Sequence, residues 1–336
     1  MFILGIETSC DETAAAIVEN GTKELASSLA SSAEIHEQYG GVVPEVAARK
    51  QVEFIVPVIA ECLKKSGLNK NQIDALAVTV GPGLIGSLVV GVEAAKALSI
   101  AWNKPLVPVN HLVGHIYGNF VSETFSQIVF PALVLIVSGG HTDLVLMRGH
   151  GDFEYIGGTL DDAAGEAFDK VARILNISKY LGGPALSKLA STWNGEKLPV
   201  KLPRPMIHED NFDFSFSGLK TATKRLIESD ATLSPAAVAR EFENAIVDVL
   251  VTKTIKAAKV HNTKCILLAG GVAANATLRT QLTASGKQIG TPVFVPPIRL
   301  CTDNAIYIAA AAFFNPAHKS LEEIVANPSL GVMDSF

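Results

Sequence analysis

The chain contains 336 residues, of which 48% are hydrophobic and 18% are charged, with a formal net charge of −5 and a pI near 5.9. This balance is typical of a compact α/β enzyme and excludes a disordered or fibrous protein. Because single hydrophobic cores stop growing at about 250 to 300 residues, the length predicts two lobes with a cleft between them.

The charge and the cysteines restrict the cellular setting. The acidic balance leaves no broad basic footprint, so any RNA would need local patches or partner proteins. The four cysteines lie far apart and form no C-x-x-C pair, which predicts reduced thiols rather than disulfides or a thiolate zinc site. No signal peptide is visible, and apolar runs are interrupted before about 18 residues. We therefore expect a soluble, cytoplasmic protein without a membrane span.

The predicted elements alternate between strands and helices along the chain. The first segment reads as a strand over 2–6, a polar turn and a strand over 14–18. A helix over 44–65 follows, kinked at Pro57 and ended by Gly67. The later elements are strand 74–80, helix 84–102, strand 106–109, helix 162–175, strand 265–269 and helix 275–284. This alternation favours a parallel or mixed sheet covered by helices, and 194–218 is predicted as an ordered loop.

An internal similarity suggests that the fold is duplicated. The segments 5–21 and 135–151 align without gaps, so that Thr8 falls on Ser138 and Gly21 on Gly151. Both read as apolar strand, small hydroxyl-bearing turn, apolar strand and glycine. We interpret them as two copies of one supersecondary unit, each opening a lobe, with chance similarity of two hairpins as the alternative.

Two histidines show the spacing of metal ligands. Asn110 can cap a helix that begins at His111, which places His111 and His115 at i and i+4 on one helical face. The metalloprotease motif has a glutamate after its first histidine, where this chain has Leu112. Asp303, before an apolar helix, could complete a set of two histidines and one carboxylate. Structural or surface histidines, and a simple N-cap role for Asp303, are the alternatives.

Several glycine-rich turns follow strands, as nucleotide-binding loops require. Glycine permits close backbone approach, and helix N-termini offer free N–H groups. These turns are 81–83, 137–140, 182–183 and 270–275. None matches the Walker A or the G-x-G-x-x-G pattern, which excludes a P-loop and argues against a dinucleotide fold. Asn275 could cap a helix or could direct its amide toward a nucleotide.

An acidic cluster at 161–170 allows two interpretations. Asp162, Glu166 and Lys170 share one helical face, as in a solvated salt-bridge helix. Alternatively, its carboxylates bind a ribose hydroxyl or a metal-bound water, and Asp169 is then the candidate for the ribose.

Together these motifs resemble one known family, the tRNA N6-adenosine threonylcarbamoyltransferases of the bacterial type. The resembling segments run nearly end to end and keep their order: 5–13, 40–45, 111–115, 137–142, 161–170, 213–220, 270–275 and 301–304. The resemblance implies the actin-like ATPase fold, with a duplicated βββαβαβα-type core in two lobes around a central cleft. We assign one lobe to 1–128, which a C-terminal helix at 304–336 could complete, and the other to 129–303.

The resemblance also implies site residues and ligands. A divalent metal, Fe²⁺ or Zn²⁺, would be held by His111, His115 and Asp303. Adenine nucleotide or substrate contacts would come from Ile136, Val137, Ser138, Gly139, Gly140, Asp169, Gly183 and Asn275. Actin-like enzymes keep an acidic residue in the first turn near the reacting phosphate, and on that basis we take Asp11 as the hypothetical catalytic base.

The implied reaction transfers threonylcarbamoyl from threonylcarbamoyl-AMP to N6 of adenosine 37 in tRNAs that read codons beginning with adenine, and releases AMP. The family works with a paralogous actin-like partner protein and a small P-loop ATPase, which fits the acidic pI. A small-molecule kinase of the actin-like fold and a metallopeptidase are the alternative enzymes, and a scaffold without activity is a further one.

Overall fold

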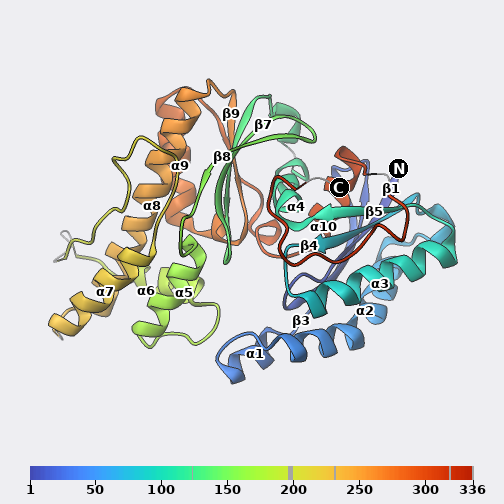
Figure 1. Ribbon diagram of the computed structural model, residues 1–336, viewed down its shortest axis with the longest axis horizontal. Helices are drawn as coiled ribbons and strands as arrows, with labels where there is room; N and C mark the ends of the chain where they lie inside the picture. The colour runs from blue at the N-terminus through green and yellow to red at the C-terminus, as the bar shows by residue number, and fades with distance from the viewer. Residues whose placement is uncertain (123, 196–199, 231, 318, 335–336) are drawn as a thin grey trace. The chain divides into compact units, whose positions relative to one another are not determined.

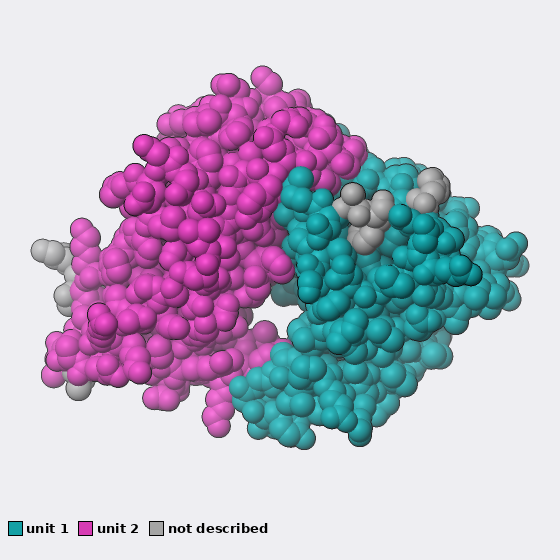
Figure 2. Space-filling model, viewed as in Figure 1, with its two compact units in different colours: residues 1–127, 296–336 teal, residues 128–295 magenta. Residues whose placement is uncertain are grey.

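The computed structural model describes residues 1–122, 124–195, 200–230, 232–317 and 319–334. The chain forms two compact units (Figure 2). Unit 1 contains Met1–Gln127 and Pro296–Phe336, and unit 2 contains Ile128–Val295. The chain therefore returns to unit 1 before residue 304. Within the returning segment, Arg299 Nη1 pairs with Glu24 Oε2 at 2.5 Å.

Unit 1 is built on a five-stranded mixed sheet in the order β3-β2-β1-β4-β5 (Figure 1). Its strands are β1 (Phe2–Glu7), β2 (Glu12–Glu19), β3 (Lys23–Ser31), β4 (Ala75–Gly81) and β5 (Leu106–Asn110). Its helices are α1 (Ala33–Tyr39), α2 (Pro44–Ser66), α3 (Ile85–Trp102), α4 (His111–Tyr117) and α10 (Ala305–Phe314). Short 3₁₀ turns lie at Lys70–Gln72, Gly118–Phe120, Phe125–Gln127 and Ile298–Leu300.

Both faces of this sheet are covered. Leu4 and Ile6 pack with residues of α2 and α3, such as Ile55 and Val92, in one apolar core. Successive side chains of a strand point to opposite faces, so Gly5 lies on the other face. There an added Cβ would come within 2.4 Å of Ala305 O, so only glycine lets the start of α10 approach β1 this closely.

Unit 2 repeats this plan with the sheet order β8-β7-β6-β9-β10. Its strands are β6 (Ala132–Val137), β7 (Thr142–Gly149), β8 (Asp152–Gly158), β9 (Cys265–Ala269) and β10 (Val293–Phe294). Its helices are α5 (Ala164–Ile174), α6 (Gly182–Ser191), α7 (Ser217–Ser229), α8 (Pro235–Val260), the 3₁₀ turn Gly271–Ala274 and α9 (Ala276–Gln288).

The predicted duplication is confirmed strand by strand. Shifting β1 and β2 by the 130 residues that separate Gly5 from Leu135 reproduces the bounds of β6 and β7. In each unit the first strand pairs antiparallel with the second and parallel with a later strand, β4 or β9. The turn differs: Glu7 pairs with Ala14, whereas Val137 pairs with Thr142, so the first hairpin has the longer turn.

Several predicted elements differ in extent. The helix predicted over 275–284 continues as α9 to Gln288. The helix over 44–65 continues through Pro57 to Ser66 and ends at Gly67, which is left-handed with φ of 68°. The helix expected over 162–175 begins only at Ala164, because Asp162 lies in the turn before it. The expected C-terminal helix over 304–336 is wrong in length: α10 ends at Phe314, since Pro316 disfavours the α conformation of the residue before it.

The helix α3 is the one described helix that is long and apolar enough to cross a membrane. Within unit 1 it packs on the sheet and on α2, and it buries Leu88, Val92 and Ala95. It is thus packed as a helix of this unit's core.

The loop predicted over 194–218 includes residues 196–199, which lie outside the described residues. Its described part carries no helix or strand from Lys201 to Phe216, and α7 begins at Ser217. Lys253 of α8 is fully buried and anchors this loop: its Nζ donates to Asn211 O, Asn211 Oδ1 and Asp213 O at 3.2, 3.1 and 2.6 Å.

Candidate metal centre

Three neighbouring strands of unit 1 end side by side and deliver polar side chains to one edge of the sheet. Ile6 of β1 pairs with Val78 of β4, so the next residues, Glu7 and Thr79, are neighbours. Thr79 in turn pairs with Val109 of β5, which is followed by α4. The carboxyl ends of parallel strands are the usual position of sites in such sheets.

The helix α4 begins where the sequence predicts it to begin. The side chain of Asn110 accepts from the backbone N–H of Leu112 at 2.9 Å, which is an N-cap. His111 is then the first helical residue and His115 lies one turn later. The exposed fractions of these side chains are 12% and 1%, so they are not surface histidines.

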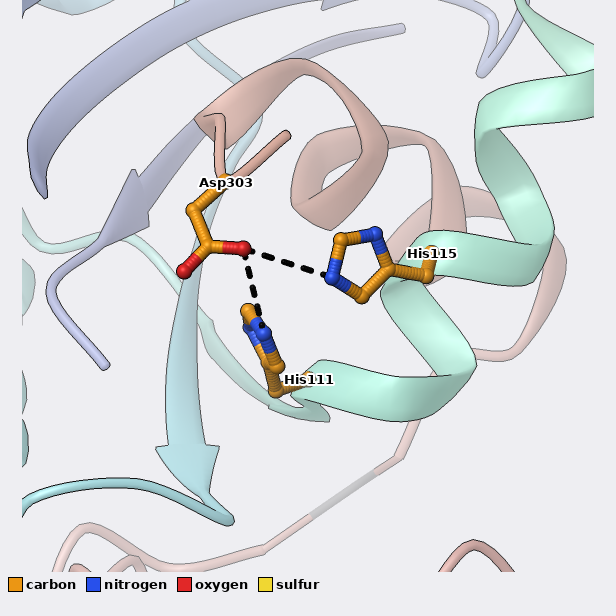
Figure 3. Close-up of side chains that lie close together, drawn as sticks. All are labelled: His111, His115 and Asp303. Atoms are coloured by element: carbon orange, nitrogen blue, oxygen red, sulfur yellow. Dashed lines mark ion pairs between the residues drawn. The ribbon is translucent and has the colours of Figure 1, made fainter. Parts of the chain in front are cut away.

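Asp303 reaches this helix from the far end of the sequence. It precedes α10, whose cap is Asn304: Oδ1 of Asn304 accepts from Ile306 N and Tyr307 N at 3.0 and 3.2 Å. The alternative that Asp303 is a simple N-cap is therefore wrong. Its carboxylate instead points toward the two imidazoles (Figure 3).

The three side chains have the spacing of a metal-binding set. Asp303 Oδ1 lies 3.4 Å from His111 Nε2 and 3.3 Å from His115 Nε2 (Figure 3). All three ligand atoms lie within 4.8 Å of one another. Bonds of roughly 2.0 to 2.2 Å in a tetrahedral site place ligand atoms about 3.3 to 3.6 Å apart. The residues therefore fit a divalent cation and leave at least one position open.

The electrostatics of the centre favour a positive charge. Burial alone would lower the pKa of His111, but the charges of Glu7 and Asp303 raise this pKa well above its usual value. Burial raises the pKa of Asp303, yet the two histidines, chiefly His111, lower it well below its usual range. Burial is the main cause that lowers the pKa of His115. In the described part of the chain, the ion pairs of Glu7 and Asp303 are with histidine alone.

Two further side chains complete the surroundings, and the sequence patterns did not indicate either. Glu7 Oε2 lies 3.1 Å from His111 Nδ1. The hydroxyl of the fully buried Tyr307 lies 3.5 Å from both His115 Nε2 and Asp303 Oδ1. For Glu7, the signal in the sequence was an ionisable residue at the end of an otherwise apolar strand. For Tyr307, it was a single tyrosine in an alanine-rich helix.

Asp11 lies in the turn between β1 and β2 in the same unit. Burial, followed by the charge of Asp11 and then that of Asp303, raises the pKa of the Cys10 thiol, which therefore stays neutral at pH 7. Burial and then Asp11 also raise the pKa of Glu12 to about 7. The backbone carbonyl of Asp11 accepts from Ser32.

The residues predicted to contact the substrate all belong to unit 2, and those of 136–140 lie at the corresponding edge of its sheet. Ile136 and Val137 end β6, and Ser138, Gly139 and Gly140 form the turn to β7. Gly165 N at the start of α5 donates to Ser138 O at 3.2 Å. On the neighbouring strand, a Cβ at Gly270 would lie 2.4 Å from Val137 O, so the loop that leads to Asn275 passes beside this turn.

Hydrogen bonds fix the other members of this set. Asp169 of α5 accepts from Gly183 N of α6 at 3.0 Å. Asn275 caps α9, because its Oδ1 accepts from Leu278 N at 2.8 Å, and its Nδ2 donates to Ser187 and Glu243 at 2.9 and 2.8 Å. The structure thus supports the capping interpretation of Asn275 and gives its amide group protein partners.

The acidic cluster before α5 has the geometry of a salt-bridge network. Lys170 Nζ lies 2.7 Å from Asp162 Oδ1 and 2.8 Å from Glu166 Oε1. Asp161 instead accepts from the backbone N–H groups of Phe216 and Ser217, at 2.8 and 3.3 Å, and so holds the start of α7. The predicted ion pairs of Lys170 with Asp162 and Glu166 are confirmed, but Asp162 contributes from the turn before α5 and not from the helical face.

Comparison with known proteins decides the family. The sequence model of the tRNA N6-adenosine threonylcarbamoyltransferase family, TsaD, matches residues 23–310. The chain belongs to this family. The enzyme of that name from Bacillus subtilis (strain 168) is 53% identical over 316 residues, which are 93% of this chain and 89% of that protein. The one from Moorella thermoacetica is 49% identical over 329 residues, 97% and 95% of the two chains. The predicted family and enzyme class, a transferase, are confirmed.

Solved structures confirm the predicted fold. Component A of (R)-2-hydroxyglutaryl-CoA dehydratase from Acidaminococcus fermentans is 16% identical, with a TM-score of 0.53 over 93% of this chain and 98% of that one. HypF from T. kodakarensis is 15% identical, with a TM-score of 0.60 over 93% of this chain and 46% of that one. At such identities the likeness concerns the fold, which is the actin-like ATPase fold.

Proposed function

We propose that this threonylcarbamoyltransferase acts through the centre formed by His111, His115 and Asp303. In the reaction, N6 of adenosine 37 attacks the carbamoyl carbon of threonylcarbamoyl-AMP, and AMP leaves with the electrons of the broken mixed-anhydride bond. The observation that carries the proposal is the meeting of the three side chains within 4.8 Å in a member of this family.

The chain's own residues would hold the metal through Nε2 of both histidines and through Oδ1 of Asp303. A bound Fe²⁺ or Zn²⁺ would supply a Lewis acid that polarises the carbonyl or neutralises the leaving phosphate. Burial of His115 and the N-cap of α4 keep the ligands in one orientation, which such a centre requires.

The turn of unit 2 at 138–140 would bind the oxygens of the adenylate. Gly139 and Gly140 are exposed, and a Cβ at either position would meet no atom within 4 Å. The turn thus offers backbone without side chains in the way, at the carboxyl edge of the sheet. We assign further substrate contacts to Ile136 and Val137 beside this turn, and to Asp169, Gly183 and Asn275 of the same unit.

We retain Asp11 as the proposed base for the attacking amine. An exocyclic aryl amine is a poor nucleophile, and a carboxylate would accept its proton. Asp11 lies in the β1–β2 turn, and its charge acts on both neighbouring residues, Cys10 and Glu12. Normal turnover of an Asp11→Ala enzyme would contradict this role.

The acidic charge of the chain bears on how it binds tRNA. A net charge of −5 makes broad phosphate contacts by this chain alone unfavourable, which supports tRNA binding together with partner proteins. From the resemblance we infer that these partners are a paralogous actin-like protein and a small P-loop ATPase, and that the enzyme acts in the cytoplasm. An adenine nucleotide would be bound as part of the substrate.

The test combines purified chain and these partners with threonylcarbamoyl-AMP and unmodified tRNA, followed by nucleoside mass spectrometry. His111→Ala should lose product and metal together. His208→Ala, the same change at an exposed histidine of unit 2, should keep both. Absence of product with competent partners would contradict the proposal and favour the kinase. The peptidase lacks its base, because Leu112 follows His111 and is 1% exposed.

A further inference from the structure

Glu7 is a fully buried carboxylate, and neither the metal set nor the substrate set includes it. Both of its oxygens are engaged. Oε1 accepts from Ser9 N at 2.5 Å, and Oε2 accepts from Thr79 Oγ1 at 2.5 Å while lying 3.1 Å from His111 Nδ1. Removing a carboxylate from water costs several kcal/mol, so full burial at this point requires a compensating role.

We propose that Glu7 is a positioning residue that keeps a proton on Nδ1 of His111 and thereby presents the lone pair of Nε2 to the metal. This inference rests on the metal centre of the proposed function. Both oxygens of Glu7 act as acceptors, Oε1 from Ser9 N and Oε2 from Thr79 Oγ1, so Nδ1 of His111 beside Oε2 is the donor. An imidazole that binds a metal carries one N–H, so a proton held on Nδ1 leaves Nε2 as the atom that binds.

The orientation of the Glu7 carboxylate is itself fixed by the sheet. Glu7 and Thr79 follow the paired residues of β1 and β4, so their side chains are held at neighbouring positions. Ser9 N–H closes the other side from within the β1–β2 turn. With both oxygens restrained, the ring of His111 is held so that Nε2 faces Asp303 at 3.4 Å.

Replacement of Glu7 by glutamine would disturb this arrangement in either orientation of the amide. If the amide oxygen faces His111, the amide N–H₂ faces the N–H of Ser9, and two donors meet. If the amide oxygen faces Ser9, the N–H₂ faces Nδ1 of His111, which must then accept, and the ring proton moves to Nε2. A protonated Nε2 has no lone pair for a metal.

The experiment measures Zn²⁺ affinity of the full chain by competition with a chromophoric chelator. Loss of such an outer hydrogen bond weakens metal binding about 10- to 100-fold, which is the result expected for Glu7→Gln. The matched control is Glu241→Gln. Glu241 is 3% exposed and accepts from Leu202 N at 2.8 Å and from Arg204, but it lies in unit 2. The Zn²⁺ affinity of the Glu241→Gln protein should equal that of the wild type. Equal affinity in Glu7→Gln would overturn the proposal.

A second measurement needs no folded variant of Glu7. In Zn²⁺-loaded wild-type protein labelled with ¹⁵N-histidine, the His111 ring should carry its proton on Nδ1, with resonances assigned from a His111→Gln sample. Zinc on Nδ1 would overturn the proposal. Neither measurement depends on the transfer reaction, so both remain valid if the proposed function is wrong. Conversely, wild-type Zn²⁺ affinity in Glu7→Gln would contradict only the role of Glu7 and not the transfer reaction.

Discussion

Replacing Lys253 by methionine should destabilise unit 2. Its ammonium group is fully buried and makes three hydrogen bonds to Asn211 and Asp213, in the loop that leads to α7. Lys253→Met keeps the aliphatic stem but leaves two backbone carbonyls and one amide oxygen without this donor. Each hydrogen bond to a charged group contributes about 1.5 to 3 kcal/mol net.

The cost of burying the ammonium offsets part of this contribution. Burial is the main cause that lowers the pKa of Lys253, so the substitution also removes an unfavourable desolvation. We expect a net loss of about 3 kcal/mol in the free energy of unfolding, close to the effect of breaking a buried charged network. The loss should be concentrated in the loop from Lys201 to Phe216.

Lys256→Met is the matched control, one helical turn later on α8. Its Nζ bonds Glu209 O and Asp210 Oδ1, both at 3.1 Å, and the side chain is 38% exposed. Exposed contacts of this kind contribute about 0 to 1 kcal/mol. Urea unfolding gives the free energies, and hydrogen–deuterium exchange of the loop amides localises the effect. Equal exchange in the two variants, or unchanged loop protection in Lys253→Met, would refute the reasoning.

Two further predictions concern a buried acid and two glycines. Burial raises the pKa of Asp143 to about 6 from 3.8. The protonated Asp143 side chain therefore contributes its full stability to the fold below pH 3.8, and this contribution to the free energy of unfolding is lost as the pH rises through 6. Asp143→Asn should therefore stabilise the protein at pH 8 by about 1 to 3 kcal/mol and flatten the pH dependence between 4 and 6, measured by urea unfolding across that range; a variant with the wild-type pH profile would contradict the assignment. In α3, a Cβ on Gly91 would lie 2.2 Å from Thr8 Oγ1, so Gly91→Ala should cost about 1 to 3 kcal/mol. In α7, an added Cβ on Gly218 would meet no atom within 4 Å, so Gly218→Ala should stabilise the protein by about 0.5 to 1 kcal/mol. Thermal denaturation of the two glycine variants measures both effects, and equal shifts in melting temperature would contradict the packing around Gly91.

Local patterns were sufficient for most elements. Short apolar runs bounded by glycine and polar turns predicted β1, β2, β4, β5 and β9, because a strand buried on both faces is a continuous apolar run that can be recognised from neighbouring residues alone. The ungapped similarity of two segments likewise predicted the duplicated hairpins. The spacing of His111 and His115 placed two candidate ligands on one helical face for the same reason.

Long-range packing decided the rest. Asp303 meets the histidines because α10 returns to unit 1 against Gly5, and no local pattern encodes that return. Glu7 contacts His111 only because the register of β1, β4 and β5 aligns the ends of these strands. Lys253 likewise binds a loop some 40 residues earlier in the chain. The sequence by itself determined the family, the strands and the candidate ligands. Only the tertiary structure decided which buried groups orient them, because such contacts join residues that are distant along the chain.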